Sequence, residues 1–224
     1  MTQTRPSPWE PAAAVAEADR RLHAPAAARN RDAIRDTLRS LLPESGLVLE
    51  IASGSGEHIV HFAEAMPALR FLPSDPAPEA LASIAAWTAQ SGRENVLPPR
   101  RIDAADPAWP ATLPPGETPG AILCINMIHI APWTATEGLF RGAGALLPTG
   151  AQLILYGPFR RPGRPLEPGN AAFDESLRER DPAFGLRDLG EVTALASTAG
   201  FGEPKVIEMP ANNLTVVFGK QAER

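Results

Sequence analysis

Cysteine and long apolar runs are what this sequence of 224 residues has least of. Its single cysteine, Cys124, excludes an internal disulfide bond and a zinc site built from cysteines, and it fits a reducing compartment. The sequence has no run of about 18 apolar residues that could span a membrane. Its first residues also lack the apolar core of a secretory signal peptide. We therefore expect a soluble, cytoplasmic protein with no membrane partner.

Basic residues are also in deficit. The 21 Lys and Arg residues are outnumbered by 26 Asp and Glu residues, which gives a net charge of -5. Because phosphate backbones are bound mainly by Lys and Arg, this balance disfavours a nucleic-acid partner. His58 and His61 lie on one predicted helix, but two histidines without a further ligand do not make a metal site. No metal is expected.

The remaining composition is that of an ordinary globular protein, with 44% hydrophobic and 21% charged residues. The length fits one α/β domain. Residues 1–28 mix proline, alanine and charged residues, and they predict an N-terminal arm or a flap over a cofactor cleft. Residues 29–224 are expected to form a single domain.

Apolar periodicity predicts strands and helices in alternation. A helix is expected from Asn30, a good N-cap residue, to Pro43. The third strand contains Pro98 and Pro99, which favours an irregular or edge strand. Asn212-Asn213 predicts the tight turn of a final hairpin. The expected strands are 47–50, 69–72, 96–102, 121–125, 151–156, 205–209 and 214–218.

This order of elements predicts an α/β fold with a doubly wound, mostly parallel, seven-stranded sheet and a C-terminal antiparallel hairpin. In such sheets, ligands bind at the carboxyl ends of the strands. The first strand ends at Glu50, and the chain then passes through Gly54 and Gly56 into a helix. Strand, glycine loop and helix form a cradle for a nucleotide cofactor, because glycines permit close backbone approach and the helix N-terminus offers free N–H groups.

Two classes of nucleotide fit this loop poorly. The fingerprint of a nicotinamide or flavin dinucleotide needs a third glycine, and this chain has Ile59 at that place. A phosphate-binding P-loop needs Lys followed by Ser or Thr after the glycines, and neither pair follows here. A NAD-dependent oxidoreductase is therefore the less favoured alternative.

The run 50–56 resembles the first motif of class I S-adenosylmethionine-dependent methyltransferases: acid, any residue, small residue, any residue, Gly, any residue, Gly. Ala52 is a mild departure, because many members have glycine there. The resemblance implies that Asp75, at the end of the second strand, holds the ribose hydroxyls. It also implies that Asp103, or the nearby Asp106, faces the adenine amino group.

Longer phrases resemble one narrower group. Residues 29–31, 49–54, 73–76, 126–130, 156–159 and 209–214 look like the methyltransferase-like twenty-six family, a group of uncharacterised class I methyltransferase-like proteins. The resemblance runs from residue 29 to the end of the chain and implies a Rossmann-like fold that binds S-adenosyl-L-methionine. It implies no substrate. The cofactor-binding residues that it implies are Asn30, Glu50, Ala52, Ser53, Gly54, Gly56, His58, Asp75, Asp103 and Asn126.

Three of these residues also have purely structural interpretations. Glu50 could interact with a helix dipole, Asp75 could belong to an Asp-Pro turn, and Asn126 could cap the following turn.

The methyl acceptor is expected to bind after the fourth and fifth strands. His129 follows the fourth strand and is the candidate base, since histidine ordinarily titrates near neutrality. Tyr156 ends the fifth strand and is the second catalytic candidate. The alternatives are a loop histidine bonded to backbone and a tyrosine packed in the core. Arg160, Arg161 and Arg164 could bind an acidic substrate or be solvated.

The leading hypothesis is an S-adenosylmethionine-dependent methyltransferase that acts on a small molecule or peptide. Direct in-line methyl transfer depends mainly on proximity and alignment, so no catalytic triad is needed. The alternative is a cofactor-binding pseudoenzyme or partner protein without transferase activity. The sequence does not distinguish these two hypotheses.

Overall fold

The computed structural model describes residues 19–114 and 116–222. Residues 1–18 of the predicted arm lie outside this range. The helices are α1 (Pro25–Leu38), α2 (Glu57–Ala65), α3 (Pro78–Ser91), η1 (Trp109–Thr112), η2 (Met127–His129), α4 (Trp133–Leu146), α5 (Pro168–Arg180), α6 (Leu189–Thr198) and η3 (Pro210–Asn212). The strands are β1 (Gly46–Ile51), β2 (Leu69–Pro73), β3 (Ala121–Ile125), β4 (Gln152–Gly157), β5 (Phe159–Arg160), β6 (Arg187–Asp188), β7 (Lys205–Met209) and β8 (Asn213–Gly219).

Within the described residues, the main sheet has six strands in the order β2-β1-β3-β4-β8-β7. Strands β2, β1, β3 and β4 are parallel, whereas β8 runs antiparallel to both β4 and β7. The predicted α/β class, mostly parallel sheet and C-terminal hairpin are therefore confirmed. The sequence did not indicate the second small sheet, in which β5 pairs with β6.

The segment 96–102 is the irregular edge strand that its prolines predict, so the described sheet has six regular strands and not seven. This segment lies at the sheet edge, where Val96 and Arg100 form isolated parallel bridges to β2 and to the residue after it. Between the two bridges stand Pro98 and Pro99, which have no N–H to donate to a strand ladder. The edge position is occupied, but the prolines interrupt the regular hydrogen bonding.

Two other boundaries differ from the predictions. Helix α1 begins at Pro25, so Asn30 lies inside the helix and is not its N-cap. Proline suits the first helical turn because its missing N–H would be unpaired there in any case. The hairpin turn is η3, with left-handed backbone at Ala211 and Asn212, and β8 already begins at Asn213.

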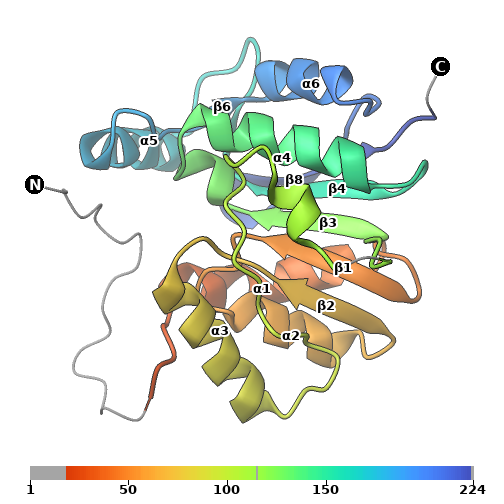
Figure 1. The fold of residues 1–224 in the computed structure, drawn as a ribbon. Coiled ribbons are helices and arrows are strands. Elements are labelled where there is room, and N and C mark those ends of the chain that lie inside the picture. The colour runs from red at the N-terminus through yellow and green to blue at the C-terminus, as the bar shows by residue number, and fades with distance from the viewer. Residues whose placement is uncertain (1–18, 115, 223–224) are drawn as a thin grey trace, which may run out of the picture.

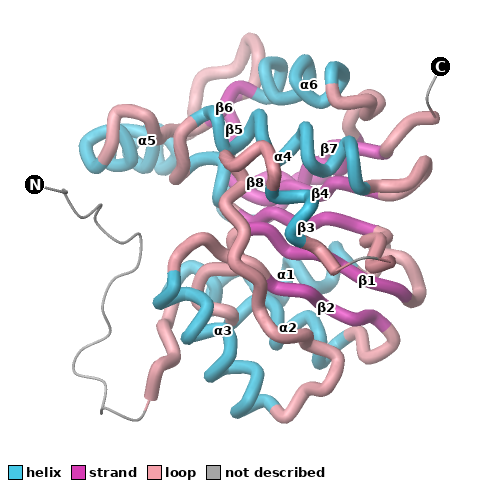
Figure 2. Tube along the Cα trace, viewed as in Figure 1, coloured by secondary structure: helices cyan, strands magenta, loops and turns pink. Residues whose placement is uncertain are grey.

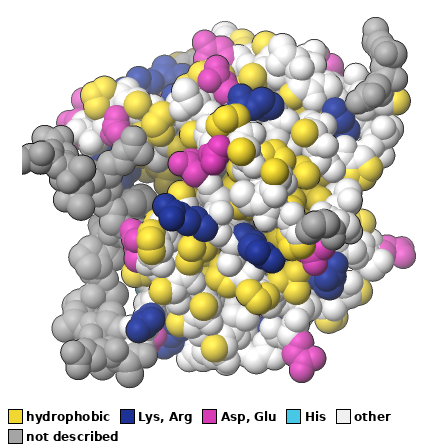
Figure 3. Space-filling view, viewed as in Figure 1, with side chains coloured by type: hydrophobic (Ala, Val, Ile, Leu, Met, Phe, Trp, Pro, Cys, Tyr) yellow, Lys and Arg dark blue, Asp and Glu magenta, His cyan; other side chains and the backbone are white. Residues whose placement is uncertain are grey.

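No described helix is long and apolar enough to cross a membrane. On the face of the molecule shown in Figure 3, Lys and Arg side chains lie apart from one another and are interspersed with acidic side chains.

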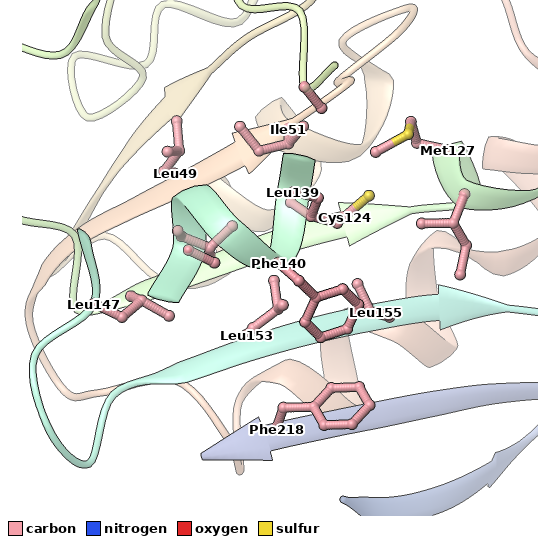
Figure 4. Packing of buried hydrophobic residues seen from close by; sticks show 14 of the residues in the cluster. Leu49, Ile51, Cys124, Met127, Leu139, Phe140, Leu147, Leu153, Leu155 and Phe218 are labelled. Atoms are coloured by element: carbon pink, nitrogen blue, oxygen red, sulfur yellow. The ribbon is translucent and has the colours of Figure 1, made fainter. Parts of the chain in front are cut away.

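Different helices cover the two faces of the sheet, as Figure 2 shows. Val48 and Leu123 belong to the cluster with α1 and α2, whereas their neighbours Leu49 and Cys124 belong to the cluster with α4 and α6. Because both faces are buried, the central strands are continuous apolar runs. Figure 4 shows the cluster on the α4 side, with Leu49, Ile51, Cys124, Leu139, Phe140, Leu153, Leu155 and Phe218 among its labelled members.

The described part of the predicted arm packs beside the start of α2. The backbone N–H of Leu22 donates to Ser83 Oγ on α3 at 2.7 Å, and the N–H of Ala24 donates to Glu57 Oε2 at 2.6 Å. Trp87 Nε1 donates to the Leu22 carbonyl at 3.0 Å. Residues 19–24 are thus fastened next to the glycine loop.

Trp109 fixes the loop that follows the irregular edge segment. Its ring is buried, and its Nε1 donates to the Gly138 carbonyl on α4 at 3.0 Å. A Cβ atom on Gly142 would lie 2.1 Å from Trp109 Cζ2, so the helix needs glycine at this contact. The segment that carries Asp103 and Asp106 is therefore held by the packing of one ring on α4.

We predict that Gly142→Ala destabilises the protein by about 1–3 kcal/mol, because an added methyl group overpacks the Trp109 contact. The measurement is urea unfolding followed by circular dichroism. Gly169→Ala in α5 is the matched control, since no described atom lies within 4 Å of its added Cβ. The control should be neutral or more stable by up to about 1 kcal/mol. Equal stability of the two variants would contradict the packing argument.

Candidate functional site

Hydrogen bonds join the glycine loop after β1 to the end of β2. Ser53 N donates to the Ser74 carbonyl at 2.8 Å, and Ser74 N donates back to Ser53 Oγ at 3.1 Å. Gly54 N donates to Asp75 Oδ2 at 3.0 Å. Ser74 Oγ donates to the Glu50 carbonyl at 2.7 Å. The two strand ends, and the acids predicted to bind the cofactor, therefore form one unit.

Glu50 lies at the buried base of this unit. Its side chain is 1% exposed, and Oε2 has no hydrogen-bond partner among the described residues. Burial raises its pKa to about 7, with a further contribution from the nearby Asp75 carboxylate, while the Ser53 hydroxyl opposes the shift. A buried carboxyl oxygen without a partner is costly, so a polar group of a ligand that reached it would be bound favourably.

Ala52 adopts a left-handed backbone conformation, with a φ of 58°. The interpretation of Ala52 as a mild departure from glycine needs correction, because a non-glycine residue in this region carries strain of about 1–2 kcal/mol. Gly54, with a φ of 59°, shares the conformation without that cost. The hydrogen bonds of Ser53 and Gly54 hold the loop in this shape.

Gly56 serves the protein's own packing. Its φ is 90°, and a Cβ atom on it would lie 2.8 Å from Ile84 Cα on α3. The absent side chain therefore makes room for a neighbouring helix, which corrects the expectation that it makes room for a ligand. Its backbone still begins α2 at the loop.

Asp75, predicted to hold the ribose, and Asp103 and Asp106, the two candidates for the adenine contact, differ in their surroundings. Asp75 is buried, and its carboxylate accepts both the Gly54 N–H and the Ala77 N–H. Burial raises its pKa, and these two hydrogen bonds oppose the shift. Asp103 and Asp106 are exposed, and each accepts a backbone N–H two residues further on. Turn bonds thus occur at all three acids, while Asp75 is the one joined to the glycine loop.

Asn30, His58 and Tyr156 form a second group. Asn30 Oδ1 lies 2.8 Å from His58 Nε2, and the Asn30 side chain is near enough to Tyr156 to oppose the rise of its pKa. Burial lowers the pKa of His58 to about 4 and raises the pKa of Tyr156. Tyr156 packs in the cluster beneath α1 and α2, as the core-packing alternative expects. The Asn30–His58 contact joins α1 to α2, and the end of β4 packs beneath them through Tyr156.

Asn126, His129 and Gly157 meet where β3 and β4 end. A Cβ atom on Gly157 would lie 2.6 Å from His129 Nε2 and 3.1 Å from Asn126 Oδ1, so the side chains fit because Gly157 has none. Asn126 has a φ of 61°, and its N–H donates to the Tyr156 carbonyl at 2.8 Å. His129 packs edge-on against Phe159 with ring centroids 5.1 Å apart.

The His129 ring is buried, and neither of its nitrogens has a hydrogen-bond partner in the ranges 19–114 and 116–222. Burial lowers its pKa to about 3, with a further contribution from the positive charge of Arg187, so the ring is neutral at physiological pH. The backbone carbonyl of His129 does have a partner, the Gly185 N–H at 2.9 Å. The ring itself is therefore not the backbone-bonded loop histidine of the structural alternative.

Sequence reasoning missed several residues that shape this side of the site. Arg187 donates to the carbonyls of Ile128 and Ala131, at 2.7 and 2.6 Å, and so holds the turn that carries His129. Gly157 could have been noticed, because a glycine at the end of a buried strand often marks a close approach. No local pattern marks Arg187, since its partners are distant in the sequence.

The described residues contain no group of three or more His, Cys, Asp or Glu side chains placed to hold a metal ion. Instead of sharing a ligand, His58 bonds Asn30 while His61 Nε2 lies 2.9 Å from Asp32 Oδ1. Two shallow hollows of about 270 and 740 Å³ lie near β5 and have arginines in their walls.

The fold is similar to that of class I methyltransferases. It resembles the S-adenosylmethionine-dependent methyltransferase SibL in its apo form, with a TM-score of 0.68 and 19% identity over 88% of this chain and 56% of SibL. It also resembles an O-methyltransferase family protein from Burkholderia thailandensis, with a TM-score of 0.69 and 14% identity over 87% of this chain and 60% of that one. An O-methyltransferase family 2 protein from Planctomyces limnophilus DSM 3776, in complex with apigenin, has a TM-score of 0.67 and 20% identity over 85% and 60% of the two chains.

These likenesses show a methyltransferase fold, and this chain spans 56–60% of the length of each of the three structures. The chain itself belongs to the DUF938 family, described as "Protein of unknown function", which it matches over residues 21–220. The match begins within the predicted arm 1–28. It does not confirm the methyltransferase-like twenty-six name, which stays a prediction.

We predict that the buried Glu50 makes stability fall as pH rises from about 4.5 to about 7. The unfolded chain releases this proton near the ordinary pKa of 4.5, whereas the folded protein keeps it up to about 7. Folding therefore takes up a proton in this window, at a cost of about 1.4 kcal/mol per pH unit. The neutral buried rings of His58 and His129 contribute stability that rises with pH over part of this range. Glu50→Gln should therefore make the slope of stability against pH more positive, by up to about 1.4 kcal/mol per pH unit, and raise the stability of the ligand-free protein at pH 8. Urea unfolding at several pH values measures both effects.

Glu64→Gln on α2 is the control for this experiment, because Glu64 is exposed. It should keep the slope of the unsubstituted protein. An unchanged slope in Glu50→Gln would show that Glu50 is not the titrating group.

Proposed function

We propose that this protein is an S-adenosyl-L-methionine-dependent methyltransferase that transfers a methyl group directly, in line, to a small molecule or peptide. The observation that carries the proposal is the buried Glu50 carboxyl, which has an oxygen without a partner in the described chain, beneath the glycine loop. The likeness to methyltransferase structures supports the fold for this role.

The residues around the loop fit this cofactor. Glu50 offers an unpaired acceptor for the amino group of its methionine part, and hydrogen bonds between a buried acid and a charged donor are among the stronger ones. Asp75 is held at the end of β2, and each of its oxygens has a second lone pair for a ribose hydroxyl beyond the N–H that it accepts. The backbone of Ser53 and Gly54 connects the two acids. Asp103 or Asp106 would then face the adenine.

When bound, S-adenosylmethionine supplies an electrophilic methyl group for direct displacement by the acceptor. The protein's own contribution is to align the two reactants and to exclude water. The contact of Asn30 with His58 joins α1 to α2, and Tyr156 at the end of β4 packs in the cluster beneath both helices and so supports this wall of the site. Asn126 lies between the loop of β1 and the acceptor side, at the end of β3.

His129 is the proposed base, although burial removes the near-neutral pKa that the sequence led us to expect, so its pKa must rise when the acceptor binds beside it. Because its ring is neutral and both nitrogens lack protein partners in the described structure, one nitrogen can accept a hydrogen bond from a hydroxyl or amine of the acceptor. Binding of the acceptor would also satisfy a buried polar group that otherwise costs about 1–3 kcal/mol. Tyr156 is buried in the core cluster beneath α1 and α2, which suits a supporting role better than direct contact with the acceptor.

We predict that S-adenosylhomocysteine raises the melting temperature of the protein and that NAD does not. A ligand present at about 100 times its Kd stabilises a native protein by about 2.7 kcal/mol. Asp75→Asn should weaken the binding of S-adenosylhomocysteine at least tenfold, or by about 1.4 kcal/mol. Asp36→Asn, an exposed change on α1, is the control and should bind like the unsubstituted protein. A shift with NAD alone would support the oxidoreductase instead.

We predict further that His129→Gln lowers methyl transfer about 100-fold or more while the Kd for S-adenosylhomocysteine stays within twofold. The assay uses labelled methyl donor with fractionated cell extract, followed by mass spectrometry of the product. Full transfer by His129→Gln would refute the base. Cofactor binding without transfer to any fraction would favour the pseudoenzyme.

A further inference from the structure

A hollow of about 740 Å³ lies beside the His129 turn and is lined in part by Trp133, Arg160, Arg178, Leu186 and Arg187. We name it the arginine hollow. It is open to solvent, so a ligand there would be only partly enclosed. Its arginines come from β5, α5 and β6, which sequence reasoning did not bring together.

The basic side chains of the arginine hollow are held in a built arrangement. Arg160 pairs with Asp174 Oδ2, and Arg178 Nε donates to the same oxygen at 3.2 Å. Asp174 is buried, and its other oxygen accepts the Leu186 N–H at 2.7 Å. A Cβ atom on Gly185 would come within 2.8 Å of both Asp174 Oδ1 and Arg178 Nη2, so the cluster closes tightly around a glycine. Arg160 is therefore not merely a solvated loop residue.

Charge at this cluster is not balanced. Two guanidinium groups share the single carboxylate of Asp174, which leaves one positive charge. The Arg160 and Arg178 side chains remain 42% and 49% exposed, so several of their N–H donors are available to a ligand. Two acids also line the hollow: Asp188 caps α6 by accepting the N–H groups of Gly190 and Glu191, and the side chain of Glu191 is exposed. With Arg187 included, three arginines and three carboxylates balance over the whole hollow, so the excess positive charge is local to the Arg160–Arg178 pair.

Three consecutive residues connect the arginine hollow to His129. Gly185 N donates to the His129 carbonyl, Leu186 N donates to Asp174, and Arg187 Nε donates to the Ile128 carbonyl. The segment therefore holds the arginine pair and the proposed base in one rigid arrangement. A ligand anchored at Arg160 and Arg178 would lie next to the turn that carries His129.

We infer that the arginine hollow binds the carboxylate of the methyl acceptor, a small monoanionic organic acid with an apolar body. Arg160 and Arg178 share one carboxylate and keep exposed N–H donors, and arginine pairs bind carboxylates through paired N–H donors. Trp133 and Leu186 supply an apolar wall for the rest of the molecule. The inference deepens the proposed function and rests on it for the identity of the acceptor, but binding of the acid is measurable without transfer.

The test compares an acid with its neutral analogue of the same shape. The Kd values of 4-hydroxybenzoate and 4-hydroxybenzamide, and of hexanoate and hexanamide, are measured by NMR titration with and without S-adenosylhomocysteine. At least one acid should bind about tenfold or more tightly than its amide. Arg178→Gln and, separately, Arg160→Gln should bring the acid to the Kd of the amide and leave the Kd of the amide unchanged.

Each single variant leaves Asp174 with one arginine partner, so its buried carboxylate is still paired. Arg70→Gln is the charge-matched control, because Arg70 lies on β2 and pairs with Glu117. The inference is overturned if acids and amides bind equally, if neither acid binds at about 10 mM, or if both arginine variants keep the affinity for the acid. S-adenosylhomocysteine binding is titrated separately, so loss of cofactor binding with intact acid discrimination would count against the proposed function alone.

Discussion

The hydrogen bonding between the loop after β1 and the end of β2 is the constraint on which the candidate site depends. Ser53, Gly54, Ser74 and Asp75 bond to one another across two parallel strands whose register is fixed by a fully buried core. This network keeps Ala52 in a conformation that alanine avoids, and it closes over a carboxyl that would otherwise prefer water. The strain and the buried acid are tolerated because the sheet on both sides determines where the loop must run.

The part of the site that is built locally could be predicted from the sequence. Glu50 and Asp75 follow apolar runs, and parallel strands bring their carboxyl ends to one edge, so their proximity follows from topology alone. The same logic gave the mostly parallel sheet and the final hairpin. Local patterns do not encode the left-handed backbone of Ala52, and they do not show that the space at Gly56 is taken by Ile84. These features depend on neighbours that only the folded chain supplies.

The acceptor side was harder to predict because it is built from tertiary contacts. Strands β5 and β6 have two residues each, too few to show any periodicity in the sequence. They pair with each other although α5 separates them along the chain. Asp174 lies inside a helix whose sequence indicates only a solvated surface, yet it is buried by arginines from before and after it in the chain. The proposed cofactor loop is built from consecutive residues and leaves a clear trace in the sequence, whereas the proposed acceptor hollow is formed by distant segments and leaves almost none.

The interrupted edge at Pro98 and Pro99 bears on how the molecule behaves among its own copies. A sheet edge with free N–H and C=O groups invites strands of other molecules to add to it, and prolines remove the donors that such addition needs. At the opposite edge, β7 has exposed Lys205 and Glu208. Their charges disfavour the pairing of β7 with a strand of another molecule. Both ends of a largely apolar sheet are thereby protected against edge-to-edge aggregation, so any association of copies would be expected to use helical surfaces or loops.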